Sequence, residues 1–264
     1  MMSSLNAIFV IVLMFLCNIC QSQNSDIITE GKITYEKTLY LRNILKKKFV
    51  EKADPVTKPQ FERIQSSVPE KVTLTKELLF AEGKTDFHPG KDNVIEPKTK
   101  SLIEMLALDF GSTTIMDVQK NEFKRFSQFM GDKFVIYDTL KKVKWKITDE
   151  YRDIAGYRCR RANGLTSDSL YIVAYYCYEI PIASGPESIT GLPGLVMGLI
   201  SPEQHFSLFA KEVDKIPPIV IREPEGFASK KIVSRNEVTS YFKNSLGKMM
   251  NQDTFNYIIG LLHF

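Results

Sequence analysis

Six short segments of β-prone sequence follow one another in the middle of the chain, and this regularity restricts the fold more than any other feature. They read TTIMDVQ, FKRFSQF, KFVIYDT, KVKWKIT, YRCRRAN and SLYIVAYYCY, and turn signals such as Gly131-Asp132 separate several of them. Within KVKWKIT, the apolar residues Val143, Trp145 and Ile147 alternate with lysine and threonine. Because successive side chains of a strand point to opposite faces, this alternation predicts an antiparallel meander with one face in water.

Strand-like sequence also lies on both sides of this central region. GKITYEKTLYL begins at Gly31 and KVTLTKELLFAEG follows it, while LVMGLIS and HFSLFAKEV come later and are joined by the turn SPEQ. Pro55, Pro59 and Pro69 argue against a long regular element between residues 42 and 70, and SLIEMLALDF is compatible with either a strand or a helix. The sequence therefore predicts a mainly β fold of the α+β class.

The periodicity changes to that of a helix near residue 234. Ser234 and Glu237 have the spacing of a capping box. The apolar residues that follow recur on one helical face, at Val238, Tyr241, Phe242, Leu246 and Met249. A second apolar segment, TFNYIIGLLHF, comes after them. We expect this C-terminal helical segment to dock against the sheet.

Residues 1–22 have the pattern of a secretory signal peptide. Their apolar core, residues 7–16, is too short to span a bilayer as a helix. Small residues at the −3 and −1 positions predict cleavage after Ser22, so that the mature chain begins at Gln23 and forms a single domain over residues 23–264. An uncleaved N-terminal anchor is the alternative. The processed protein would be periplasmic or secreted.

Only two cysteines, Cys159 and Cys177, remain after this processing. An even number of cysteines in an oxidising compartment is typical of disulfide pairing. The segments that hold them are predicted to form a hairpin with its turn near residues 164–168, which places the two cysteines almost opposite each other. The sequence therefore predicts a disulfide between Cys159 and Cys177.

The charge balance disfavours nucleic acid as a partner. The chain carries 35 basic and 31 acidic residues, a net charge of +4, and the excess is spread along the chain. Nucleic-acid binding would require Lys and Arg gathered with aromatic residues, and that pattern is missing. A peripheral contact with a membrane is the most that this balance suggests.

No metal, cofactor or catalytic motif is present in the sequence. The three histidines, His88, His205 and His263, are isolated from one another, and Glu203 with His205 is interpreted as a surface pair. Neither a nucleophile elbow nor a phosphate-binding loop occurs. The sequence therefore predicts no metal site and no cofactor.

The run GLPGLV, from Gly191 to Val196, is predicted to form a turn. Pro193 followed by Gly194 is the combination that a type II turn requires, with positive φ at the glycine. The flanking leucines and valine would tuck this turn onto apolar surface. Two roles stay open: a packing turn that closes the sheet, or a lip of backbone beside a ligand or partner groove.

Two blocks of sequence carry a family resemblance: KWKITDEYRDIAGYRCRRA, and AYYCYEIPIASGPESITGLPGLVMGL. They resemble the GLPGLI family of exported Bacteroidetes proteins, whose members show WKIT-E---IAGY-C-KA and AWYT-EIP---GP----GLPGLIL. The matching residues are Trp145, Ile147, Thr148, Gly156, Tyr157, Cys159, Glu179, Pro181, Gly185, Pro186 and Gly191 to Leu195. The chain departs from the family at Tyr175, Cys177 and Val196, where members have Trp, Thr and Ile.

The resemblance implies an exported, sheet-rich protein of the cell envelope. It implies a curved antiparallel sheet or open half-barrel, similar to the periplasmic carriers of lipids and lipoproteins, with the C-terminal helix added. It implies no settled activity, so function has to be weighed from the residues.

Two functions of different classes remain. The first is a non-catalytic binding or carrier protein for an apolar ligand or a partner segment, which the 44% content of hydrophobic residues and the aromatic strands favour. The second is a hydrolase-like envelope enzyme with a dispersed active site. No catalytic residue is predicted. The candidate ligand- or partner-binding residues are Gly191, Leu192, Pro193, Gly194, Leu195 and Tyr175. An apolar cavity would favour the carrier, and convergent carboxylates with histidine the enzyme.

Overall fold

The computed structural model describes residues 27–264, apart from residues 92, 110, 130, 217 and 248–249. The predicted signal peptide and its cleavage before Gln23 lie outside the described residues. Of the predicted domain over residues 23–264, the described part therefore begins at residue 27.

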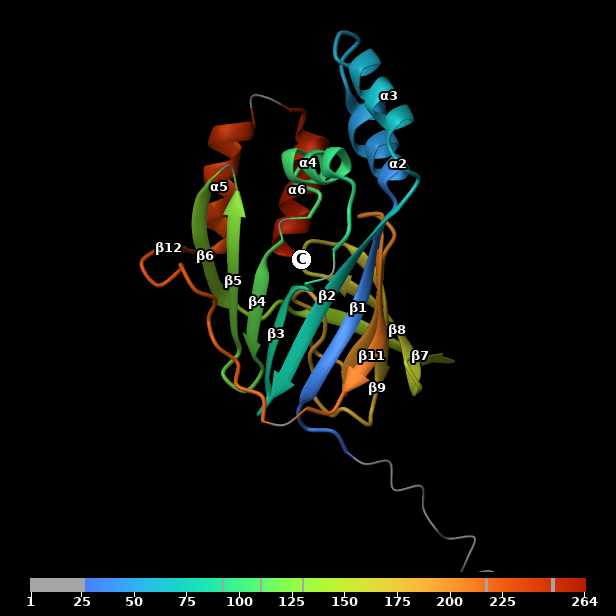
Figure 1. Ribbon diagram of the computed structural model, residues 1–264, viewed down its shortest axis with the longest axis vertical. Helices are drawn as coiled ribbons and strands as arrows, with labels where there is room; N and C mark the ends of the chain where they lie inside the picture. The colour runs from blue at the N-terminus through green and yellow to red at the C-terminus, as the bar shows by residue number, and fades with distance from the viewer. Residues whose placement is uncertain (1–26, 92, 110, 130, 217, 248–249) are drawn as a thin grey trace, which may run out of the picture.

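One open sheet of 12 strands forms the body of the molecule (Figure 1). Its strands lie in the order β12-β6-β5-β4-β3-β2-β1-β11-β10-β9-β8-β7. All neighbours are antiparallel except β12 and β6, which are parallel. The strands are β1 (Gly31–Leu39), β2 (Val72–Ala81), β3 (Lys84–Pro89), β4 (Thr113–Asp117), β5 (Glu122–Phe129), β6 (Asp132–Thr139), β7 (Val143–Ile154), β8 (Tyr157–Thr166), β9 (Tyr171–Cys177), β10 (Leu195–Ser201), β11 (Phe206–Asp214) and β12 (Lys231–Val233). The prediction of a mainly β, antiparallel fold is confirmed.

The first strand lies in the centre of the sheet, between β2 and β11. In β1, alternate residues are fully buried, and these include Ile33, Tyr35 and Leu39. The same two-residue period puts Lys37 among the buried positions, where only 4% of its surface is exposed. The strand that brings most of the core together therefore also brings a charge into it.

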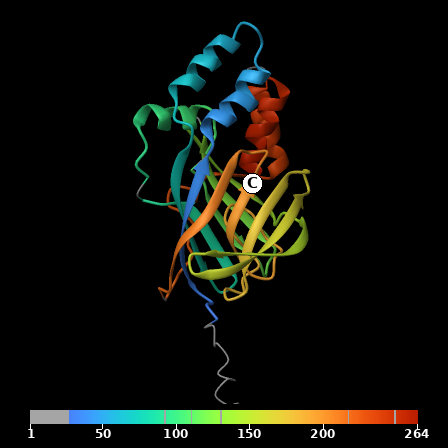
Figure 2. The ribbon, with the colours of Figure 1, turned by 90° about the vertical axis from the view of Figure 1, so that its right-hand side faces the viewer.

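Short helical elements stand at one end of the sheet (Figures 1 and 2). They are α2 (Leu41–Ile44), a π-helical turn η1 (Leu45–Phe49), a 3₁₀ turn η2 (Val50–Lys52), α3 (Lys58–Ser67) and α4 (Pro97–Met105). The prolines keep these elements short but do not exclude them, because Pro59 stands in the first turn of α3, where no intrahelical bond is lost. The ambiguous segment SLIEMLALDF supplies the end of α4 and the loop after it.

Two C-terminal helices complete the fold. α5 (Arg235–Leu246) begins at the capping box formed by Ser234 and Glu237. α6 (Gln252–His263) begins at Asn251, whose side chain accepts a hydrogen bond from Thr254 N. The buried residues of α6 are Thr254, Phe255, Tyr257, Ile258, Ile259, Gly260, Leu261 and Leu262, which point in nearly every direction around its axis. The helix is therefore packed into the hollow of the sheet rather than laid on its surface.

The core has two parts. The larger cluster joins β1, β2 and β8–β11 with the helical end, and the smaller one joins β4–β6 with α5 and α6. Within the smaller cluster, the Phe242 ring packs against Phe129 at a centroid distance of 4.8 Å and edge-to-face against Phe134 at 6.2 Å. Among the described residues, no helix combines the length and the apolar character that a membrane crossing requires.

Cys159 on β8 and Cys177 on β9 face each other, but the structure holds both as free, buried thiols. Continuing the pairing of Arg160 with Tyr176 by one residue places the two cysteines opposite each other. The predicted disulfide is therefore not formed, although the predicted hairpin is. A hydrogen bond with Cys177, together with burial, raises the pKa of the Cys159 thiol far above its ordinary value. Because the thiolate is the form that attacks, this environment disfavours thiol exchange.

We expect both thiols to resist iodoacetamide in the native protein and to react fully once the chain is unfolded without reductant. Burial and the raised pKa of Cys159 account for the protection. Mass spectrometry after each treatment measures the alkylated fraction. Thiols that stay unmodified in the unfolded, unreduced chain would instead reveal a disulfide.

Candidate functional site

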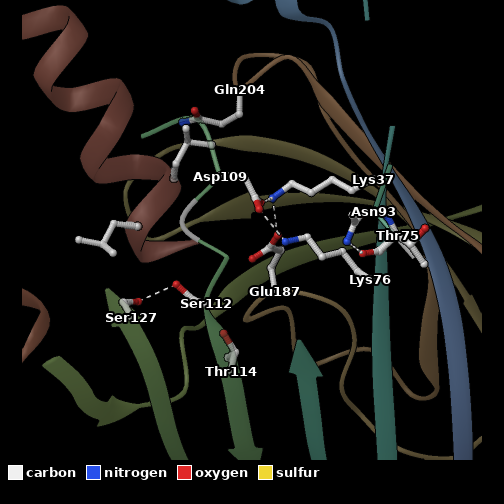
Figure 3. A network of polar contacts seen from close by, with 12 residues as sticks. Lys37, Thr75, Lys76, Asn93, Asp109, Ser112, Thr114, Ser127, Glu187 and Gln204 are labelled. Atoms are coloured by element: carbon white, nitrogen blue, oxygen red, sulfur yellow. Dashed lines mark hydrogen bonds and ion pairs between the residues drawn. The ribbon is translucent and has the colours of Figure 1, made fainter. Parts of the chain in front are cut away.

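Five charged side chains meet inside the curved sheet, and we call them the ion cluster. They are Lys37 on β1, Lys76 on β2, Asp109 after α4, Arg125 on β5 and Glu187 in the loop between β9 and β10. Figure 3 shows four of them, Lys37, Lys76, Asp109 and Glu187. Their side chains are at most 12% exposed. Three cations and two carboxylates are thus shielded from water together, so that each charge has to find its partner within the cluster.

Each carboxylate of the ion cluster bridges two cations. Asp109 accepts hydrogen bonds from Lys37 Nζ at 2.8 Å and from Lys76 Nζ at 2.7 Å. Glu187 accepts from Lys37 Nζ at 2.7 Å and from Arg125 Nη2 at 3.2 Å. Lys37 therefore contacts both carboxylates, and it links the pair of Asp109 and Lys76 to the pair of Glu187 and Arg125.

The remaining positive charge is compensated by the C-terminal end of α6. Arg125 Nη1 donates to the carbonyl oxygens of Leu262, at 2.6 Å, and Leu261, at 3.3 Å, while its Nε donates to Thr114 Oγ1 at 3.0 Å. The last carbonyls of a helix are unpaired and carry partial negative charge, which favours a cation there. The arginine thus fixes the helix end inside the sheet.

Local sequence explains how the lysines reach the interior. Lys37 and Lys76 occupy buried-phase positions of two paired strands, and the pairing of Tyr35 with Lys76 makes them diagonal neighbours on one face. The signal that could have revealed them is a lysine at an otherwise apolar position of a strictly alternating strand.

The loop between β9 and β10 presents Glu187 inward. Glu187 has a positive φ of 60°, an uncommon conformation for a residue with a side chain. Ser184 Oγ lies 3.0 Å from Thr85 Oγ1, and Ser188 Oγ donates to the carbonyl oxygen of Phe264. Contacts on both sides therefore hold the loop against β3 and the end of α6.

Electrostatics keeps the two carboxylates ionised. Burial alone would raise the pKa of Asp109, but Lys37 and Lys76 outweigh it and lower this pKa well below its usual range. Burial likewise opposes the effect of Lys37 and Arg125 at Glu187, and the net result is again a lowered pKa. The stability that the two groups contribute is therefore present above pH ~4 and lost as the pH falls below it. A general acid or base needs a pKa near the working pH, so neither group is tuned for that task.

Three adjoining cavities lead away from the ion cluster. One of about 20 Å³, the volume of a single water, is lined by the cluster itself. Asp109 and Gly111 also line a cavity of about 520 Å³, which in turn shares Ala107 and Phe129 with one of about 690 Å³. We call the last one the apolar cavity.

The apolar cavity lies where η1, α3, the end of α4 and α6 meet. Its apolar lining consists of Phe49, Ala53, Phe61, Met105, Leu106, Ala107, Phe129, Met250 and Ile258. Polar groups gather at its rim, where Lys52 pairs with Asp253 at 2.7 Å and its carbonyl oxygen accepts from Asn251 Nδ2 at 2.6 Å. The cavity therefore has an apolar interior, and a few polar contacts join the residues at its rim.

The GLPGLV run has a different geometry from the predicted turn. The positive φ, 91°, belongs to Gly191, while Gly194 does not adopt a positive φ. The predicted type II turn with positive φ at Gly194 is therefore wrong. A side chain at Gly194 would collide with the backbone carbonyl of Cys177, so the glycine is required by close approach.

The candidate binding residues line none of these three cavities. Leu192 and Leu195 are buried in the main core, and Pro193 is exposed. Tyr175 lies half-buried beside Phe209, with ring centroids 6.3 Å apart. Tyr175 thus lies on β9, and the run forms the end of the loop before β10 together with the first two residues of that strand.

The two blocks of the family resemblance meet at Trp145. Its Nε1 donates to the carbonyl oxygen of Thr190 at 2.9 Å, and Gly191 leaves room beside the indole. The first block therefore supports the loop that the second block forms.

None of the three histidine side chains forms an ion pair or hydrogen bond with the ion cluster among the described contacts. His88 contacts Asp86 at 3.1 Å and Glu77 at 3.5 Å, and the hydrogen bond with Asp86 raises its pKa. Burial lowers the pKa of His263 to about 4. Among the described residues, no group of three or more His, Cys, Asp or Glu could hold a metal ion.

Comparison with known proteins places the chain near a family without a known function. A protein family of unknown function, Porph_ging, matches residues 165–198, which contain β9 and the GLPGLV run. No curated protein matches the sequence.

Solved structures of PNGF-II in two crystal forms match this chain over part of their length. The structure in space group C2 is 18% identical with a TM-score of 0.50, over 83% of this chain and 33% of that chain. The structure in space group P21 is 16% identical with a TM-score of 0.48, over 85% and 34% of the two chains. The chain therefore spans about a third of the PNGF-II structure that it matches, and the likeness concerns the fold alone.

Replacement of Gly194 by alanine should cost about 2 kcal/mol or more of unfolding free energy, since the new Cβ meets a fixed backbone carbonyl. Gly191→Ala is the matched control, because it adds the same methyl group at a positive φ in exposed surroundings and should cost about 1 kcal/mol. Urea unfolding of both variants measures the difference. A larger loss at Gly191 would contradict the close-approach explanation.

Neutralising Glu187 should be far more damaging than neutralising a surface carboxylate. Glu187→Gln leaves Lys37 and Arg125 without their shared carboxylate, and breaking a buried ion pair costs roughly 3–5 kcal/mol. Glu150→Gln removes the partner of Arg161 at the surface and should cost less than about 1 kcal/mol. Equal losses of stability in the two variants would show that the ion cluster is not buried as described.

Proposed function

We propose that this chain is an exported protein of the cell envelope that binds an apolar ligand without catalysing a reaction. The observation that carries the proposal is the apolar cavity, whose volume of about 690 Å³ falls in the range of small-molecule sites. Its lining is mostly aliphatic and aromatic with a few polar groups at the rim, which is the usual composition of such sites.

The size of the cavity argues for an occupant. The cavity opens to water at exposed lining residues such as Met105, so apolar matter that enters it removes apolar surface from water. A hollow of about 690 Å³ between Phe49, Met105 and Ile258 would therefore be filled favourably by apolar matter. Each methylene group transferred there from water contributes about 0.8 kcal/mol, so an acyl chain is a ligand of suitable chemistry.

The entrance is at the end of α4. Met105 lines the cavity and is nevertheless 66% exposed, so it belongs to both the cavity wall and the surface. A ligand can therefore enter beside this side chain without passing the ion cluster.

The alternative, a hydrolase-like enzyme, receives less support from the same region. Asp109 and Glu187 line the small cavity at the ion cluster, and their lowered pKa values keep them ionised and engaged with lysine and arginine. Glu104 and Asp54 line the two larger cavities, and no described histidine lines any of the three. The open half-barrel resemblance to lipid and lipoprotein carriers also favours the carrier. Export rests on the predicted signal peptide, so the periplasm or the exterior remains part of the proposal.

A charge at the entrance should abolish binding of an apolar probe. We expect Met105→Glu to weaken the binding of N-phenyl-1-naphthylamine by about tenfold or more, because a carboxylate would have to lose water beside the bound ring. Val94→Glu is the control, since Val94 is 99% exposed and does not line the apolar cavity. Fluorescence titration measures both affinities.

Two outcomes would refute the proposal. One is the failure of the wild-type protein to bind the probe, and the other is the same affinity for wild type and Met105→Glu. Because Met105 is exposed, circular dichroism should show both variants folded, so that a loss of binding reports on the site.

A further inference from the structure

The sheet ends in a long strand whose outer side has no partner. β7, 12 residues in length, pairs with β8 on one side, and no described strand pairs with its other side. Lys144, Lys146 and the residues 149–153 are exposed. Figure 1 shows β7 beyond β8 at the far end of the sheet from β12. Such an edge presents unpaired backbone N–H and C=O groups to any extended chain that reaches it.

Most of the excess basic charge of the protein gathers on the hairpin that contains this edge. Residues 141–163 contain eight Lys and Arg against three Asp and Glu, a net charge of +5, whereas the whole chain carries +4. The rest of the protein is therefore slightly acidic. The interpretation that the excess is spread along the chain is wrong for the folded protein.

Ion pairs within the hairpin leave one row of lysines uncompensated. Asp149 pairs with Arg160 at 2.8 Å and Glu150 with Arg161 at 2.6 Å. No described acidic group pairs with Lys142, Lys144 or Lys146. The first half of β7 therefore offers positive charge at every second residue.

The other face of the same stretch is apolar. Val143 and Trp145 are half-buried and Ile147 is 41% exposed, and they alternate with the lysines along the strand. A strand added beside β7 would place its successive side chains alternately next to a lysine and next to an apolar group.

We propose that the outer edge of β7 binds an extended segment of another protein as an additional strand, in which acidic and apolar residues alternate. Backbone hydrogen bonds supply affinity in this mode, and the alternating side chains supply specificity. Pairing of β7 with the same edge of a second copy is disfavoured by its own lysines, because two such edges would bring like charges face to face. This site is separate from the apolar cavity and does not depend on the function proposed for it.

The test uses two labelled octapeptides of identical composition. In one, Glu and Val alternate, and in the other, four Glu precede four Val. We expect fluorescence anisotropy to show at least about tenfold tighter binding of the alternating peptide, since only it matches the strand period. Methylation of the backbone nitrogens should abolish binding when placed on one alternate set of residues and be tolerated on the other, because an added strand bonds through one edge.

Protein variants test the lysines. The double variant Lys144→Glu/Lys146→Glu should lose about tenfold or more in affinity for the alternating peptide. Lys58→Glu/Lys98→Glu is the matched control, because these lysines are also exposed and should leave the affinity unchanged. Circular dichroism should show both variants folded.

Three results would overturn the proposal. They are equal binding of the two peptides, equal loss with the two pairs of variants, and binding to phosphatidylglycerol vesicles through Lys144 and Lys146 without binding of the alternating peptide. The last result would identify an anionic membrane surface as the partner of this hairpin.

Discussion

Lys37 and Arg125 hold the carboxylate of Glu187 between them, and this contact joins parts of the chain that are far apart. Lys37 and Glu187 are 150 residues apart in sequence, and Arg125 and Glu187 are 62 apart. The central strand, the β4–β6 side of the sheet and the loop before β10 are thereby fixed to one another. Arg125 extends the connection to the last turn of α6. A buried ion pair adds little net stability over an apolar packing, but a broken one is costly, so the cluster selects this arrangement over others.

The ion cluster also explains why the interior of the sheet is not filled uniformly. Charged groups need satisfied partners and tolerate water nearby, so the region around Asp109 stays polar and carries the small cavity. Apolar side chains complete the wall of this small cavity, since Phe87, Leu108 and Leu261 also line it. Other apolar side chains of the helical end gather around Phe49, Phe61 and Ile258, where the apolar cavity lies. The interior therefore has a polar region at the ion cluster and an apolar region at the helical end.

The sheet could be predicted from the sequence because its strands obey a two-residue period over most of their length. The same period places Lys37 and Lys76 inside, yet an isolated lysine in a strand ordinarily belongs to the wet face. Their partners are 150 and 33 residues away, and no local pattern relates such distant positions. The helical end is hard to predict for a similar reason. A proline is unfavourable inside a helix but harmless in its first turn, where Pro59 lies. The number of prolines in residues 42–70 therefore predicts less about the structure than the position of each proline within its element.

The structural role of the GLPGLV run depends on two preceding parts of the chain, the end of β9 and the loop that carries Glu187. Gly194 lets the backbone pass close to Cys177, and Leu195 then begins β10 beside β9. This return of the chain closes a loop whose other members include Glu187 and Ser188. Trp145 supports the loop from β7 through its hydrogen bond to Thr190. The run therefore has a positioning role in this fold: it closes the loop that carries Glu187 into the sheet, and Glu187 binds Lys37 and the arginine that holds the end of α6.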